Sequence, residues 1–187
     1  MARRAGPESR FVLEVDGLHW LDGMDEEKDL CAHGVVTVAI GGVTLADPAD
    51  GEQCVSAAAL HLLRTLESDH TPESPVGEHL VPHCGHGLYE GPTADADVVI
   101  VGCSSGVDWQ VVHGEGAVTL RTAGGAEAHV SLASWGDAVC TFSDRVEAFY
   151  DRSSPKVPDD DVEAAGFEAF RREWRRRRDR AGTALKG

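Results

Sequence analysis

The chain has 187 residues, of which 42% are hydrophobic and 26% are charged, and its formal net charge is −15. This composition excludes wholesale disorder, and the length suits one domain with a core of its own. No run of 18 apolar residues is present and no apolar stretch follows the basic start, so we expect neither a membrane-spanning helix nor a signal peptide. We therefore expect a cytoplasmic protein with no membrane association.

The first part of the chain predicts β-structure. Alternating apolar residues predict a half-buried strand over 11–16, with a bulge at Gly17. A β-branched run then predicts a hairpin over 35–45, because Gly41-Gly42 is a strong signal for a tight turn.

A helix and a long irregular stretch are expected next. Apolar residues recur at three- and four-residue spacing and predict an amphipathic helix over 55–67. The stretch 68–97 is rich in Pro and Gly and should be irregular, except for a short strand at Leu80-Val81.

The clearest structural prediction is an antiparallel meander over 98–132 that is covered by a helix over 134–150. Four apolar runs predict four strands, and two glycine-containing hairpin connections join the last three of them. Ser134 and Asp137 have the spacing of a capping box at the start of the helix. Five apolar side chains should form its buried stripe: Trp135, Val139, Phe142, Val146 and Phe149.

The last helix should begin near Asp160, because acidic residues occupy its first turn and Arg its last. Its aromatic stripe of Phe167, Phe170 and Trp174 is too short to stabilise it alone. We expect these aromatics to dock on the acidic body, with the Arg side chains over Asp and Glu at the exposed edge.

Together these elements predict an α+β fold, in which an antiparallel β-meander and hairpins pack against two or three helices. The expected organisation is a flexible N-terminus (1–9), a single α+β domain (10–152), and a linker with a basic amphipathic C-terminal helix (153–187).

The charge is unevenly distributed along the chain. Residues 1–170 carry 9 Lys and Arg against 30 Asp and Glu, a net of −21, whereas residues 171–187 carry 8 against 2, a net of +6. An acidic body repels nucleic acid and attracts basic partners, so we expect a basic protein partner and no nucleic-acid binding. Solubility or salt adaptation explains the same acidity without any partner.

The five cysteines are odd in number and have no framework spacing, so we expect reduced thiols. The segment Gly102–Gly106 matches the G-x-S-x-G pattern of a hydrolase nucleophile elbow, which requires a helix directly after the serine. A strand-like sequence follows instead, which favours a Gly/Ser connection between strands.

Imidazole and thiolate groups occur in two short clusters, as zinc sites require. The candidate zinc ligands are Cys31, His33, His83, Cys84 and His86. In a second interpretation, Cys84 or Cys103 is a nucleophile with one of these His as its base. In a third, the His side chains only satisfy backbone groups of a Gly-rich loop.

Acidic loop residues and one tryptophan are the candidate contacts for a basic partner: Asp22, Asp25, Glu26, Glu27, Asp29 and Trp109. The leading hypothesis is a non-catalytic interaction module, such as an immunity protein that masks the basic groove of a nuclease. The alternative is a small metal-dependent or thiol enzyme built on the loop His83-Cys84-Gly85-His86.

Overall fold

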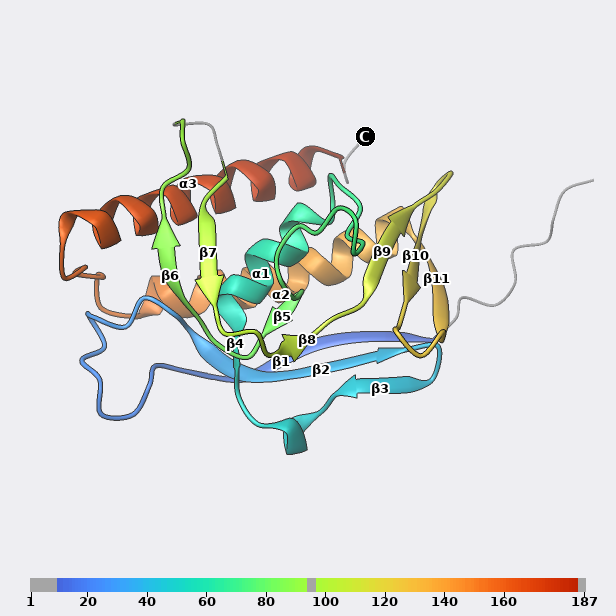
Figure 1. Ribbon diagram of the computed structural model, residues 1–187, viewed down its shortest axis with the longest axis horizontal. Helices are drawn as coiled ribbons and strands as arrows, with labels where there is room; N and C mark the ends of the chain where they lie inside the picture. The colour runs from blue at the N-terminus through green and yellow to red at the C-terminus, as the bar shows by residue number, and fades with distance from the viewer. Residues whose placement is uncertain (1–9, 94–96, 185–187) are drawn as a thin grey trace, which may run out of the picture.

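The computed structural model describes residues 10–93 and 97–184, so the predicted flexible N-terminus lies outside the described residues. It confirms the α+β class with antiparallel sheets, three α-helices and a C-terminal helix (Figure 1). None of the described helices is both long and apolar enough to cross a membrane.

The first sheet is antiparallel and has the strand order β1-β2-β3, with β4 also paired to β2. Its strands are β1 (Phe11–His19), β2 (His33–Ile40), β3 (Val43–Ala46) and β4 (Gln53–Cys54). The predicted bulge is confirmed, because the β1–β2 register shifts between Asp16 and His19 and Gly17 has φ 61°. Gly41 and Gly42 both have positive φ, as the predicted hairpin turn requires.

Helix α1 (Val55–Arg64) lies in the centre of the molecule and contacts β2, α2 and α3 (Figure 1). The sequence predicts an amphipathic helix, but all ten residues are buried. Its polar residues are accommodated by hydrogen bonds. His61 Nδ1 lies 2.7 Å from the His79 carbonyl oxygen, and burial lowers the pKa of this imidazole to about 4.

The second half of the chain forms three further antiparallel groups of strands. These are the pair β5 (Val81–Pro82) and β8 (Gly106–Val107), the pair β6 (Gly85–Tyr89) and β7 (Val99–Gly102), and the sheet β9 (Gln110–His113), β10 (Ala117–Arg121) and β11 (Glu127–Ser131). The expected four-stranded meander is therefore corrected to three strands, because β7 pairs with β6 and not with β9. Val99 and Val101 are about half exposed, which shows that this apolar run is not a central strand.

Helix α2 (Leu132–Arg152) contacts β10, β11, β1 and α1. The predicted stripe is confirmed: four of its five side chains are at most 2% exposed and Phe149 is half-buried. The helix begins earlier than expected, with Ser131 as its N-cap, and the Ser131 side chain accepts a hydrogen bond from the Ser134 amide.

Helix α3 (Asp161–Ala184) lies across the top of the molecule and contacts β6, α1 and α2 (Figure 1). Gly166 permits this close packing, because a Cβ there would lie 1.9 Å from the Leu88 carbonyl oxygen of β6. Phe170 and Trp174 are 1% exposed, and Phe167 packs beside Phe170 with parallel rings. The expectation that the aromatics dock the tail is therefore confirmed.

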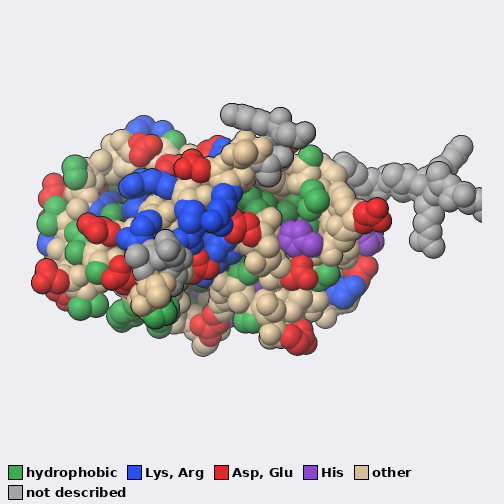
Figure 2. Space-filling model, turned by 90° about the horizontal axis from the view of Figure 1, so that it is seen from above, with side chains coloured by type: hydrophobic (Ala, Val, Ile, Leu, Met, Phe, Trp, Pro, Cys, Tyr) green, Lys and Arg blue, Asp and Glu red, His purple; other side chains and the backbone are tan. Residues whose placement is uncertain are grey.

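The arginines of α3 pair with carboxylates of the body, and Figure 2 shows Lys and Arg gathered among Asp and Glu on this face. The expected exposed pairs are found at Arg178, which binds both carboxylate oxygens of Asp144. Arg177 differs, because it is 8% exposed and bonds to Glu173, Glu67 and Asp97 at 2.6–2.8 Å. Part of the basic block therefore belongs to the interior.

Candidate functional site

The candidate site lies in one long, interrupted β-ribbon. The pairs β5–β8 and β6–β7 form its two ends, with Pro82 opposite Gly106 and Gly85 opposite Gly102. Between these two pairs, one strand has two residues (83 and 84) and the other has three (103–105). The extra residue makes a β-bulge at 103–105, and bulges of this kind often direct side chains at active sites.

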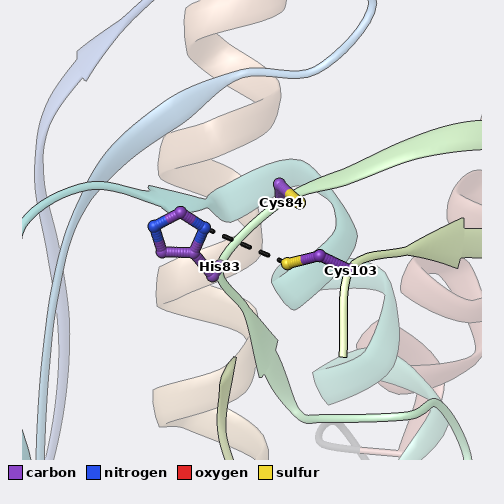
Figure 3. Close-up of side chains that lie close together, drawn as sticks. All are labelled: His83, Cys84 and Cys103. Atoms are coloured by element: carbon purple, nitrogen blue, oxygen red, sulfur yellow. Dashed lines mark hydrogen bonds between the residues drawn. The ribbon is translucent and has the colours of Figure 1, made fainter. Parts of the chain in front are cut away.

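The bulge brings three chemically reactive side chains together: His83, Cys84 and Cys103 (Figure 3). Cys84 precedes Gly85 and Cys103 follows Gly102, so the two thiols come from facing positions of paired strands. Their sulfurs and a ring nitrogen of His83 all lie within 4.8 Å of one another. His83 is exposed and both cysteines are half-buried, so reagents from solvent can reach the cluster.

Glycine is needed beside the cysteines because the two backbones approach closely. A Cβ at Gly102 would lie 2.2 Å from the Cys84 carbonyl oxygen, and a Cβ at Gly106 would lie 2.7 Å from the Val81 carbonyl oxygen. The G-x-S-x-G segment is thus a bulged connection from β7 to β8. Strand β8 follows it directly and not a helix, so the structure agrees with the expectation against a nucleophile elbow.

The environment makes Cys103 the more acidic of the two thiols. Hydrogen bonding by the Cys84 thiol is the main cause that lowers the pKa of Cys103 to about 7, and backbone hydrogen bonding at Ser105 is the second. The same contact raises the pKa of Cys84. His83 Nδ1 lies 4.0 Å from Cys103 Sγ and adds a weaker contact (Figure 3). Cys103 is therefore the thiol of the pair that ionises more readily near neutral pH.

A disulfide lies next to this cluster and corrects the expectation of five reduced thiols. Cys31 and Cys54 are bonded, with their Cα atoms 6.3 Å apart. The short strand β4 pairs with β2 and places Cys54 opposite His33, which brings the two cysteines into bonding range. A two-residue strand has no periodic pattern, so this proximity is not visible in the sequence.

Only two of the five predicted zinc ligands lie together among the side chains that the structure describes. The structure brings His83 and Cys84 together with Cys103, which the sequence predicts only as a nucleophile. Cys31 is bonded to Cys54 and is not free as a ligand. His33 is buried in β2, and the His86 side chain lies outside what the structure describes.

The acidic loop is partly used inside the molecule. Asp29 is 4% exposed, and its carboxylate accepts hydrogen bonds from the backbone amides of Leu21 (2.8 Å) and Cys31 (3.1 Å). The Glu26 carboxylate accepts one from the Ser154 amide (2.8 Å), which pins the linker before α3.

The other predicted partner contacts differ in exposure. Asp22, Asp25 and Glu27 are exposed. Trp109 is 2% exposed, so in this structure its side chain belongs to the core and not to a surface. The expected acidic patch is thus reduced to a few loop carboxylates.

The chain matches no protein-family model, no curated protein and no solved structure.

Proposed function

We propose that this protein performs thiol–disulfide exchange, with Cys103 as the nucleophile and Cys84 as the resolving thiol. One observation carries the proposal: the pairing of Gly85 with Gly102 puts the two thiols opposite each other, just beyond the ends of β6 and β7 and beside His83. Two thiols in such positions need only a small movement to form a disulfide.

The reaction follows from the difference in acidity. The Cys103 thiolate attacks one sulfur of a client disulfide, which forms a mixed disulfide and releases the first client thiolate. Cys84 then loses its proton and attacks the Cys103 sulfur. This step forms the Cys84–Cys103 disulfide and releases the second client thiolate. Two electrons pass from the protein dithiol to the client, and the reverse sequence oxidises a client dithiol.

Oxidised glutathione is a suitable probe client. We expect its addition to the folded protein to produce a Cys84–Cys103 disulfide, detected by peptide mass mapping after acid quenching. The Cys103→Ser variant should form neither this bond nor a glutathione adduct at the site. Cys140→Ser is the matched control, because Cys140 is buried on α2 and should leave the reaction unchanged. A wild-type protein whose Cys84 and Cys103 stay reduced would contradict the proposal.

Zinc binding is a second candidate, favoured by the separation of the three potential ligand atoms. Two thiolates and one imidazole are typical zinc ligands, and three protein ligands leave a position open for water or substrate. The revised ligand set is His83, Cys84 and Cys103. Protein purified without chelator should then contain close to one equivalent of zinc. Less than about a tenth of an equivalent would exclude this candidate and leave the dithiol free for exchange.

The hypothesis that this protein binds a basic protein, as an immunity protein does, rests on net charge alone. It is a separate proposal, since the exposed carboxylates Asp22, Asp25 and Glu27 lie in another part of the chain. Binding of a basic protein that weakens when these three are changed to Asn or Gln would support it.

A further inference from the structure

Four of the five cysteines lie around a single residue, Gly85. Cys84 precedes it, and Cys103 faces Cys84 from the neighbouring strand. Cys54 Sγ lies 3.5 Å from the Gly85 carbonyl oxygen, and Cys31 is bonded to Cys54. The exposed dithiol and the buried disulfide are thus neighbours along one strand.

Glycine at position 85 permits this arrangement. A Cβ there would lie 3.3 Å from the Ala57 Cβ and 3.7 Å from Cys54 Sγ. The backbone of β6 therefore packs directly on the disulfide. Cys84 is the residue before Gly85, so one peptide unit separates the outer thiol from the backbone that packs on the disulfide. The side chains of residues 84 and 85 alternate across this extended backbone, so the stretch must turn for the Cys84 sulfur to meet the Cys54 sulfur.

Burial separates the two sulfur pairs from solvent to different degrees. Cys31 is 7% exposed and Cys54 is fully buried, whereas Cys84 and Cys103 are half-buried. A thiol in solution can therefore reach Cys84 and Cys103, whereas the protein shields the Cys31–Cys54 bond from it. Reduction of the inner disulfide needs either unfolding or a thiol that is already part of the protein.

We propose that the surface dithiol exchanges with the buried Cys31–Cys54 disulfide, which is the site's own internal substrate. This inference rests on the proposed thiol–disulfide exchange and deepens it. The Cys84 thiolate attacks Cys54 Sγ, the Cys54–Cys31 bond breaks, and Cys31 leaves as a thiolate. The Cys103 thiolate then attacks the Cys84 sulfur, and Cys54 leaves as a thiolate.

The exchange is balanced without any other reactant. One disulfide and two thiols are present before and after it, and the protons lost by Cys84 and Cys103 pass through solvent to Cys31 and Cys54. The second leaving group is well placed, because Cys54 is the N-cap of α1 and the helix N-terminus stabilises a thiolate. The buried bond thereby acts as a store of two oxidising equivalents for the surface site.

Reduction by glutathione tests the relay. The protein is incubated with reduced glutathione, quenched with an alkylating agent, and the alkylated fraction of Cys31 is followed by peptide mass. We expect Cys84→Ser and Cys103→Ser to slow this reduction at least tenfold, and Cys140→Ser to match the wild type. A destabilised variant would expose the buried bond and speed its reduction, so slowing cannot result from misfolding.

A second measurement uses the wild type alone. Without added reagent at pH 8, acid quenching should trap a fraction of molecules that have a Cys84–Cys103 disulfide and free Cys31 and Cys54. Absence of this species, with equal reduction rates in all variants, would overturn the relay. If oxidised glutathione still forms the Cys84–Cys103 bond in that case, the relay fails while the proposed function stands. If neither reaction occurs, both fail.

Discussion

The guanidinium of Arg64 on α1 holds the carboxylate of Glu173 on α3 through two parallel hydrogen bonds of 2.8 and 2.9 Å. Glu173 is 1% exposed and also accepts hydrogen bonds from Arg177 and from the backbone amide of Val98, both at 2.8 Å. The remaining donors of Arg64 bind the carbonyl oxygens of Val76 and Val98. This network joins the two helices to the segments that precede β6 and β7, the strands next to the two thiols.

Replacing Glu173 by Ala should therefore destabilise the protein strongly. Two buried guanidinium groups would lose their shared partner, and breaking a buried ion pair in this way costs about 3–5 kcal/mol. Urea denaturation measures the loss. Glu168→Ala is the matched control on the exposed side of the same helix, and it should change the free energy of unfolding by less than about 0.5 kcal/mol.

The same carboxylate should make stability depend on acid pH. Burial alone would raise the pKa of Glu173, but the hydrogen bonds from Arg64 and Arg177 outweigh it and hold the pKa below its usual range. A carboxyl whose pKa is lower in the folded state stabilises fully above its unfolded pKa, about 4.3. That contribution is lost as the pH falls through the folded pKa. Urea midpoints of Glu173→Gln should therefore fall less steeply between pH 5 and 2 than those of the wild type; parallel curves would refute this.

Docking of α3 should depend on its aromatic stripe. Trp174→Ala removes a ring that is 1% exposed, at a cost of about 3–5 kcal/mol, and should expose the arginine block to trypsin. Arg175→Ala removes an exposed side chain of the same turn and should leave the helix protected. The rate of cleavage after the other arginines of 171–180 distinguishes the two. Rapid cleavage of the wild type would show that α3 is not docked.

Sequence periodicity predicted the elements whose stabilising contacts are local. The stripe on α2, the Gly41-Gly42 turn and the docked aromatics of α3 follow from spacing and turn chemistry. The pairing of β7 with β6 did not, because β6 has no apolar alternation and is held by backbone hydrogen bonds. Arg177 was also misplaced, since its buried position depends on Glu67 and Asp97, which are distant in sequence.

The site was predictable only in part for the same reason. His83 and Cys84 are neighbours in sequence, so their cluster was visible, and Cys103 was recognised as a thiol of interest. The position of Cys103 beside Cys84 depends on the register of the antiparallel pair β6–β7 and on the bulge that follows it. The Cys31–Cys54 bond depends on the pairing of the two-residue strand β4 with β2. Non-local pairings of such short strands leave no periodic signal.

The close approach of the two strands should be sensitive to a single methyl group. Gly102→Ala would place a Cβ 2.2 Å from the Cys84 carbonyl oxygen, so the strands must separate at the site. We expect slower formation of the Cys84–Cys103 disulfide with oxidised glutathione, by about tenfold or more. Gly114→Ala is the control, because a Cβ there meets only an ordinary contact at 3.6 Å. Equal rates in both variants would show that the register at Gly102 does not position the thiols.

Cys103 is expected to be an activated thiol that owes its acidity mainly to Cys84. The most direct test is the rate of alkylation of Cys103 by iodoacetamide as a function of pH, followed by peptide mass. We expect a midpoint at a pKa of about 7 in the wild type and a higher midpoint in Cys84→Ala, because the thiol that stabilises the Cys103 thiolate is removed. An ordinary thiol midpoint in the wild type, unchanged in Cys84→Ala, would contradict this expectation.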